Sequence, residues 1–365
     1  MRNVLLIDFG STYTKVTAVD ADVPRILGTA GAYTTVETDV GEGLDRALKA
    51  LYAATGPLSF DARYACSSAA GGLRMVACGL VPSLTVEAAR RAALGAGAKV
   101  IRVFSYELTD EDAEAIGLLS PDILLLTGGT DGGNRQNIEQ NAEMLAKVPG
   151  DFPIVLAGNR AAARTCAALL SNGSHETIVT ENVMPVFNKL NVGPVQEVIR
   201  ALFLRRIIQA KGLSRQQNLV DGILMPTPAA VLKALTLLSA GIGGIQGMGD
   251  LMAVDLGGAT TDVYSIADGL PNDAATILRG LPEPHEKRTV EGDIGMRYSA
   301  QGVVEAAGME KLCRLSALSE AEISALLSAI RADPGILPAP DDALSRLDFA
   351  LAAAAIELGL VRHAG

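Results

Sequence analysis

Two short segments that share one pattern constrain the fold more than any other feature of this chain. Residues 4–16 run VLLIDFGSTYTKV, and residues 253–263 run AVDLGGATTDV. Each begins with an apolar strand that ends in aspartate, turns through glycine and hydroxyl residues, and continues as a second strand. Because glycine and aspartate favour tight turns between strands, the sequence predicts two β-hairpins. We call them the first hairpin (residues 4–16) and the second hairpin (residues 253–263).

The residue types in both turns suit phosphate binding. Glycine has no Cβ, so backbone N–H groups can approach phosphate oxygens closely, and serine and threonine hydroxyls add further donors. A lysine in the first hairpin adds a positive charge. The residues predicted to bind a nucleotide are Gly10, Ser11, Thr12, Lys15, Gly257, Gly258, Thr260 and Thr261.

An aspartate ends the first strand of each hairpin, at Asp8 and at Asp255. A carboxylate at this place cannot bind phosphate directly. It can hold Mg²⁺ through water, because Mg²⁺ retains much of its hydration shell, and it can orient the water that attacks a γ-phosphate. We therefore predict that Asp8 and Asp255 are catalytic and hold Mg²⁺ by way of water.

An ordinary hairpin, in which aspartate and glycine only make the turn, is the alternative for either segment by itself. Two segments with the same order of apolar strand, aspartate, glycine and hydroxyls favour the phosphate interpretation. The chain has no Gly-x-x-x-x-Gly-Lys-Ser/Thr segment, and no Gly-x-Gly-x-x-Gly follows the first strand. These absences exclude a P-loop protein and leave a dinucleotide-binding fold unsupported.

The acidic composition argues against several classes of partner and site. The formal net charge of −10 disfavours nucleic acid as a partner. The 365 residues, 49% of them hydrophobic, are enough for two or three domains with their own cores. No uncharged apolar run reaches the roughly 18 residues of a membrane helix. The N-terminus leads into a strand without a signal peptide, so we expect a cytoplasmic location. The spacing of the cysteines favours free thiols over metal or disulfide sites, at Cys66, Cys78, Cys166 and Cys313.

Short apolar strands alternate with helices between about residues 81 and 180, which indicates parallel βαβ units. The predicted strands there are 100–104, 123–126, 154–156 and 178–180, and the predicted helices are 110–116, 136–146 and 161–170. Further strands are predicted at 62–66, 275–279 and 289–290, and further helices at 44–53, 195–211, 228–238, 293–307 and 345–362.

Two other places can be ligand sites or only structural. The segment LLLTGGTDGGN (residues 124–134) leaves a strand and enters a helix, a geometry that suits phosphate, so Gly128, Gly129, Thr130 and Asp131 form either a second ligand site or a turn. Glu291 and Asp293 lie in a glycine-containing loop after the second hairpin. They can complete a Mg²⁺ and water site, or Asp293 can cap the helix that follows.

The two hairpins resemble the phosphate-binding hairpins of the actin, Hsp70 and sugar-kinase superfamily. The motifs DFGSTY (8–13) and DLGGATTDV (255–263) are similar to the chaperone versions, and Lys15 lies where the actin version has its phosphate lysine. The resemblance implies ATP or ADP with Mg²⁺, and it gives Asp262 a place in the hydrolytic or cation site. It also implies an α/β, actin-like (ribonuclease H-like) fold with two related halves.

On this plan we predict four parts. Residues 1–80 form the first actin-like half, 81–185 an inserted or extended α/β region, 186–250 a helical return to the first half, and 251–365 a second half. The second half lacks segments that the actin-like plan places after residue 365, so we expect a truncated chain. The uncovered apolar surface of such a half favours dimerisation, as a homodimer, or aggregation.

Further segments resemble one branch of that superfamily, the glutamate mutase accessory proteins (GlmL or MutL-type reactivases, unrelated to the mismatch-repair protein MutL). They are CSSAAGGL (66–73), LTGGTDGGN (126–134), TENVMP (180–185), MPTPAAV (225–231) and RTVEGDIGMR (288–297), and they extend over nearly the whole chain in order. The resemblance implies an ATP-dependent chaperone that releases damaged cobalamin from an adenosylcobalamin-dependent mutase, its partner. A small-molecule kinase and an actin-like filament protein of the same superfamily are the alternatives.

Overall fold

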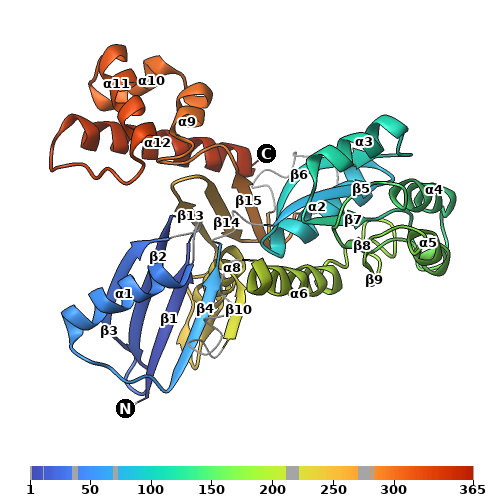
Figure 1. The fold of residues 1–365 in the computed structure, drawn as a ribbon, viewed down its shortest axis with the longest axis horizontal. Coiled ribbons are helices and arrows are strands. Elements are labelled where there is room, and N and C mark those ends of the chain that lie inside the picture. The colour runs from blue at the N-terminus through green and yellow to red at the C-terminus, as the bar shows by residue number, and fades with distance from the viewer. Residues whose placement is uncertain are drawn as a thin grey trace. The chain divides into compact units, whose positions relative to one another are not determined.

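The computed structural model describes residues 2–10, 12–34, 40–68, 73–210, 222–269, 281 and 283–364. The chain divides into two compact units (Figure 1). Unit 1 comprises Met1–Ala230 and Gly269–Glu283, and unit 2 comprises Val231–Asp268 and Pro284–Gly365. Helices and β-sheets make up both units, so the predicted α/β class is confirmed.

The first sheet of unit 1 is built around the first hairpin. It has five strands in the order β10-β4-β1-β2-β3, with β1, β2 and β3 antiparallel and β4 and β10 parallel to β1. Alternate residues of β1, namely Leu5, Ile7 and Phe9, are buried, because successive side chains of a strand point to opposite faces. The bounds are β1 Asn3–Phe9, β2 Tyr13–Asp20, β3 Arg25–Tyr33, β4 Ala62–Ser67 and β10 Gly222–Pro226, with helix α1 at Val40–Thr55.

The second sheet of unit 1 is parallel and has the order β6-β5-β7-β8-β9. The predicted βαβ alternation is therefore confirmed, and β7 (Ile123–Leu126) and β8 (Ile154–Leu156) have the predicted bounds. No strand was predicted at β5 (Arg74–Gly79), although it lies between β6 and β7. The remaining elements are the π-helical turn η1 (Pro82–Val86), α2 (Glu87–Gly95), β6 (Lys99–Ser105), α3 (Asp110–Leu119), α4 (Gln136–Leu145), α5 (Ala163–Leu170) and β9 (Thr177–Val179).

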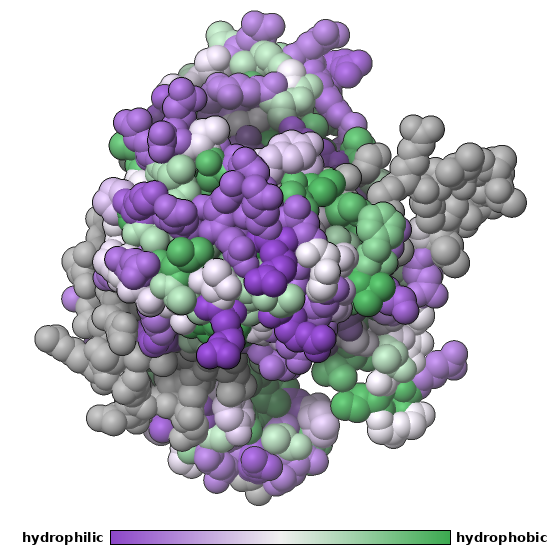
Figure 2. All heavy atoms as spheres, turned by 90° about the vertical axis from the view of Figure 1, so that its right-hand side faces the viewer, coloured by the Kyte–Doolittle hydropathy of each residue, from purple (hydrophilic) through white to green (hydrophobic). Residues whose placement is uncertain are grey.

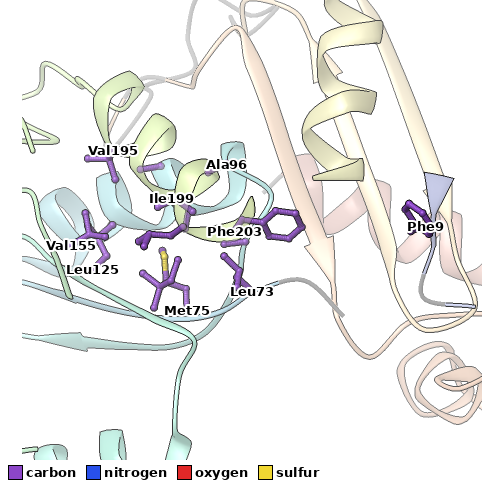
Figure 3. Packing of buried hydrophobic residues seen from close by; sticks show 14 of the residues in the cluster. Phe9, Leu73, Met75, Ala96, Leu125, Val155, Val195, Ile199 and Phe203 are labelled. Carbon is purple, nitrogen blue, oxygen red and sulfur yellow. The ribbon is translucent and has the colours of Figure 1, made fainter. Parts of the chain in front are cut away.

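One helix, α6 (Gly193–Ala210), packs on this parallel sheet. Figure 3 shows Val195 and Ile199 of α6 on the side of Leu125 of β7 and Met75 of β5, and Phe203 belongs to the same buried cluster. The helical side chains are spaced by four residues, so they form one apolar stripe. Burying each large side chain contributes about 1.5–3 kcal/mol. The apolar stripe of α6 therefore holds this helix beside the ends of β7 and β8.

The face of the molecule that carries α4 and α5 is turned toward the viewer in Figure 2. Hydrophilic side chains gather over the middle of this face, and apolar ones are scattered between them. Ion pairs along α4, such as Arg135–Glu139 and Lys147–Glu143, agree with a solvated outer surface.

Unit 2 combines a small antiparallel sheet with a group of helices. Its three-stranded sheet has the order β13-β14-β15, and helices α9 to α12 enclose an apolar core of their own. Helix α8 starts in unit 1 and ends in unit 2. The bounds are α8 Thr227–Ala240, β11 Gly241–Ile242, β12 Ile245–Gln246, β13 Leu251–Leu256, β14 Thr261–Ile266, β15 Glu286–Glu291, α9 Ala300–Ala307, α10 Met309–Ser316, α11 Glu320–Ala332 and α12 Ala343–Ala364.

Several predicted elements of this region differ from the structure. The helix predicted to start at Asp293 begins at Ala300, so the prediction that Asp293 caps it is wrong. No helix was predicted at α10 or α11. The strand predicted at 275–279 lies outside the described residues. Within the part of the chain that is described, no helix is long and apolar enough to cross a membrane.

Candidate functional site

The first hairpin forms at the predicted place. In the pairing of β1 with β2, Asp8 lies opposite Lys15 and Phe9 lies opposite Thr14. The turn is closed by a hydrogen bond of 3.1 Å from Gly10 N to Tyr13 O. A Cβ on Gly10 would lie 2.5 Å from that same oxygen, so glycine is required there. Ser11 lies outside the described residues.

The carboxylate of Asp8 lies where three parallel strands end. The Thr227 hydroxyl, directly after β10, donates a hydrogen bond of 2.8 Å to Asp8 Oδ1. The Cys66 thiol, on β4, donates a weaker one of 3.5 Å to the same oxygen. Both partners lie far from Asp8 in sequence, and Thr227 was not predicted as a site residue. Its signals in the sequence are its place between two prolines and within the segment MPTPAAV (225–231).

The thiol of Cys66 stays protonated beside this carboxylate. Burial, and after it the negative charge of Asp8, raises the pKa of Cys66 from 9.0 to about 12. The thiol is thus a hydrogen-bond donor and not a thiolate nucleophile. The prediction of free thiols is confirmed for all four cysteines, although Cys66 and Cys313 are only partly buried.

The hydroxyl of Thr12, in the turn of the first hairpin, is buried and has no hydrogen-bond partner among the described residues. A buried hydroxyl without a partner is unfavourable, so such groups often mark a place that a ligand or water completes. The Thr12 hydroxyl therefore fits a phosphate group at this turn.

The second hairpin has the same register as the first. Asp255 of β13 lies opposite Asp262 of β14, and Leu256 lies opposite Thr261. A hydrogen bond of 2.9 Å from Gly257 N to Thr260 O closes the turn. Both hairpins therefore present an aspartate just before a four-residue turn that is closed by a glycine N–H.

The loop of residues 295–298 donates hydrogen bonds to the second turn. Backbone N–H groups of Arg297 and Tyr298 both donate to Gly258 O at 2.8 Å, and that of Met296 donates to Gly257 O at 3.0 Å. A Cβ on Gly295 would lie 2.5 Å from the carbonyl carbon of Ala259, so this loop passes close to the turn. These bonds engage the loop's backbone N–H groups and hold the turn in one conformation.

Asp262 is buried in an ion pair within unit 2. It is 7% exposed, and its Oδ1 atom lies 2.8 Å from Arg288 Nε and 2.5 Å from Arg288 Nη2. Arg288, on β15, is 8% exposed. Such a pair compensates a charge that would otherwise be costly to bury. Asp255, in contrast, is exposed.

Glu291, at the end of β15, forms an ion pair with Arg362 of α12. Another pair joins the loop of residues 295–298 to the same helix, since Arg297 donates to both carboxylate oxygens of Asp348 at 2.8 and 2.7 Å. Glu291 is therefore engaged in holding α12. A role for Glu291 or Asp293 in binding a cation stays a prediction.

The loop with Gly128, Gly129, Thr130 and Asp131 follows β7 in unit 1, and it is held by two buried amides. The Asn159 side chain donates to Gly133 O and Asn134 O at 3.1 and 3.0 Å. The Asn182 side chain donates to Gly129 O and Asp131 Oδ1, both at 3.0 Å. The structure thus joins these predicted residues to each other. It does not join them to Asp8, Lys15 and Thr12 of the first hairpin, whose strands belong to the other sheet of unit 1.

A direct protein cage for a metal does not occur in the part of the chain that is described. No three His, Cys, Asp or Glu side chains converge there.

Comparisons with known proteins place the chain in a sequence family. The family model described as MutL protein matches residues 4–365. A protein named MutL from Clostridium tetanomorphum is 47% identical over 367 residues, which cover 100% of this chain and 79% of that protein.

Two solved structures show remote similarity. A Ppx/GppA family member from Aquifex aeolicus shares 12% identity, with 99% of this chain and 90% of that chain covered and a TM-score of 0.27. The activator of the 2-hydroxyisocaproyl-CoA dehydratase from Clostridium difficile, solved with ADPNP, shares 13% identity, with 61% and 99% covered and a TM-score of 0.16.

Proposed function

Because this chain belongs to the MutL protein family, we propose that it is an ATP-dependent accessory protein of an adenosylcobalamin-dependent mutase of the glutamate mutase type. In this proposal it uses ATP to loosen the mutase so that damaged cobalamin leaves and intact cofactor enters. The observation that supports the ATP-dependent part best is the repeated hairpin geometry, with an aspartate before a glycine-closed turn in both copies.

The residues of the first hairpin fit a nucleotide phosphate. Glycine at position 10 is required by the turn itself, and the buried Thr12 hydroxyl has no partner among the described residues. Lys15 is exposed, and it contributes positive charge on the strand that pairs with Asp8. We propose that these residues bind phosphate oxygens and that Ser11 adds a hydroxyl.

We propose that Asp8 and Asp255 hold the water shell of Mg²⁺. Bound there, the metal would neutralise charge on the phosphates. Both described contacts of Asp8 engage its Oδ1 atom, which fixes the carboxylate while Oδ2 remains for water within the described surroundings. Thr227 and Cys66 thus orient Asp8, and Gly257, Gly258, Thr260 and Thr261 shape the second phosphate turn.

Asp262 has a different role in this proposal. Its carboxylate is bound to Arg288 and is nearly fully buried, so its charge acts on the second hairpin from inside the sheet. We propose that the Asp262–Arg288 pair sets the electrostatic environment of Asp255, which lies opposite Asp262 on the neighbouring strand.

A reactivation assay tests the function. A glutamate-type mutase is first inactivated with bound damaged cobalamin, and it is then incubated with this protein and free adenosylcobalamin. We expect recovery of mutase activity with Mg-ATP and little recovery with ADP or without nucleotide. Equal recovery in all three conditions would rule out ATP-driven reactivation, and rapid phosphorylation of a metabolite would favour the kinase alternative.

A further inference from the structure

A wide pocket lies at the edge of the parallel sheet of unit 1 where β7, β8 and β9 end. Its volume is about 940 Å³. The loops that follow these three strands line one side, and the first turns of α6 line the other. In open parallel α/β sheets, ligands characteristically bind in the crevice outside the carboxyl ends of the strands. The pocket therefore occupies a position where this architecture forms binding sites.

Hydrogen bonds hold the loops around the pocket in place. Asn159, which is 1% exposed, accepts hydrogen bonds from Gly132 N at 3.1 Å and Ala161 N at 2.9 Å and donates to two carbonyl groups of the β7 loop. Gly129 adopts φ +70°, and a Cβ there would lie 2.3 Å from Asn134 O. A site whose shape is fixed in advance loses less entropy on binding.

Asp131 links all three loops. Its Oδ1 atom accepts hydrogen bonds from Arg160 N, after β8, at 2.9 Å and from the Asn182 side chain, after β9, at 3.0 Å. Its own backbone N–H donates to Pro185 O at 2.9 Å. Asp131 also lines the pocket, so its negative charge is held in a fixed position in the lining.

The lining carries charges of both signs. Asp131, Glu181 and Glu197 contribute three carboxylates, and Arg160 contributes one guanidinium. Within the described part of the chain, the side chains of Arg160 and Glu197 make no hydrogen bond or ion pair. Their charges are therefore available to a ligand, and the lining as a whole favours a ligand with positive charge.

We propose that this pocket binds a small zwitterionic ligand, an amino acid or short peptide that carries at least one ammonium group and one carboxylate. The carboxylates of Glu181 and Glu197 receive the ammonium group, and Arg160 receives the carboxylate through its planar guanidinium. Apolar lining from Val179 and Val198 accommodates the ligand's carbon skeleton. The volume exceeds that of a single amino acid and lies in the usual range for small-molecule sites, about 300–1,000 Å³.

Calorimetric titration of the whole protein tests this site. The probes are L-lysine, the tripeptide Lys-Ala-Ala, putrescine (ammonium groups only) and succinate (carboxylates only). The variants are Arg160→Gln and Glu197→Gln, and the matched control is Arg164→Gln, whose exposed side chain lies on α5 and does not line the pocket. Circular dichroism establishes that each variant is folded.

We expect Lys-Ala-Ala or L-lysine to bind more tightly than putrescine or succinate. Arg160→Gln and Glu197→Gln should each weaken that binding about tenfold, equivalent to ~1.4 kcal/mol, whereas Arg164→Gln should leave it unchanged. Equal binding of putrescine to wild type and Arg160→Gln, with no preference for the zwitterions, would overturn the proposal. Absence of binding by both zwitterionic probes, or an equal loss in Arg164→Gln, would also overturn it.

Discussion

Thr227 donates a hydrogen bond of 2.8 Å to Asp8, although the two residues are 219 positions apart in the sequence. The bond joins the first residue of α8 to the carboxylate near the end of β1. It fixes one oxygen of Asp8, and it ties the beginning of a helix that continues into unit 2 to the first hairpin.

Replacing Thr227 by valine should reduce ATP hydrolysis about tenfold and leave the fold intact. The change keeps the β-branched shape but removes the donor, and the lost bond to a charged oxygen is worth about 1.5–3 kcal/mol before solvent compensates. Steady-state hydrolysis at several Mg²⁺ concentrations measures the effect. Thr227→Ser should retain most activity, and Thr236→Val, whose hydroxyl bonds to Leu232 O in the same helix, is the control. Full activity in Thr227→Val would mean that the bond does not orient Asp8.

Asp255→Ala should abolish Mg²⁺-dependent hydrolysis, a loss of about a hundredfold or more, while the melting temperature changes little. The residue is exposed, so its truncation leaves no cavity in the core. Hydrolysis and thermal melting are measured on the same preparation. Asp250→Ala, an exposed aspartate just before β13, is the matched control. If Asp255→Ala hydrolyses ATP as fast as this control, the second hairpin is not the phosphate site we propose.

Arg288→Met should destabilise the protein by about 3–5 kcal/mol, because it leaves the Asp262 carboxylate buried without its partner. Urea unfolding measures this change. Asp262→Asn combined with Arg288→Met should recover part of the loss, because the buried charge is then removed as well. A double variant no more stable than Arg288→Met would show that the pair contributes through packing and not through charge.

Stability should fall as pH rises above 9, and Cys66 should account for part of the fall. Its pKa is 9.0 when unfolded and about 12 in the fold. Between these values the unfolded chain releases a proton that the folded chain retains, so the contribution is complete below pH 9 and is lost progressively up to about pH 12. Urea midpoints at pH 8 and at about pH 10 measure it. Cys66→Ala should show a smaller decline than Cys313→Ala, and identical declines would contradict the assignment.

The local pattern of residues predicted the hairpins well, since the aspartate, glycine and strand residues act on neighbours in sequence. The strands β7 and β8 were also predicted, because they are uninterrupted runs of Ile, Leu and Val. β5 was missed because Met75, Ala77 and Cys78 are buried on both faces and show neither alternation nor strong strand preference.

Distant contacts explain most of what could not be predicted. The bond between Thr227 and Asp8 depends on three strands meeting at one sheet edge, which no local pattern encodes. The helix expected from Asp293 begins later because the backbone N–H groups of Met296, Arg297 and Tyr298 are used by the second turn. The ion pairs of Asp262 and Glu291 likewise arise only when β15 and α12 are in place.

The shared register of the two hairpins makes their one difference informative. Lys15 and Asp262 occupy the same position relative to the aspartate opposite, so the cross-strand pair is attractive in the first hairpin and repulsive in the second. In the first hairpin the opposite charges lie on its own two strands. In the second hairpin the positive charge comes from Arg288 on the third strand, β15. The two hairpins are therefore not interchangeable modules. A chimera carrying the second hairpin in place of the first would need a transplanted arginine, while the reverse exchange would leave Arg288 facing a lysine.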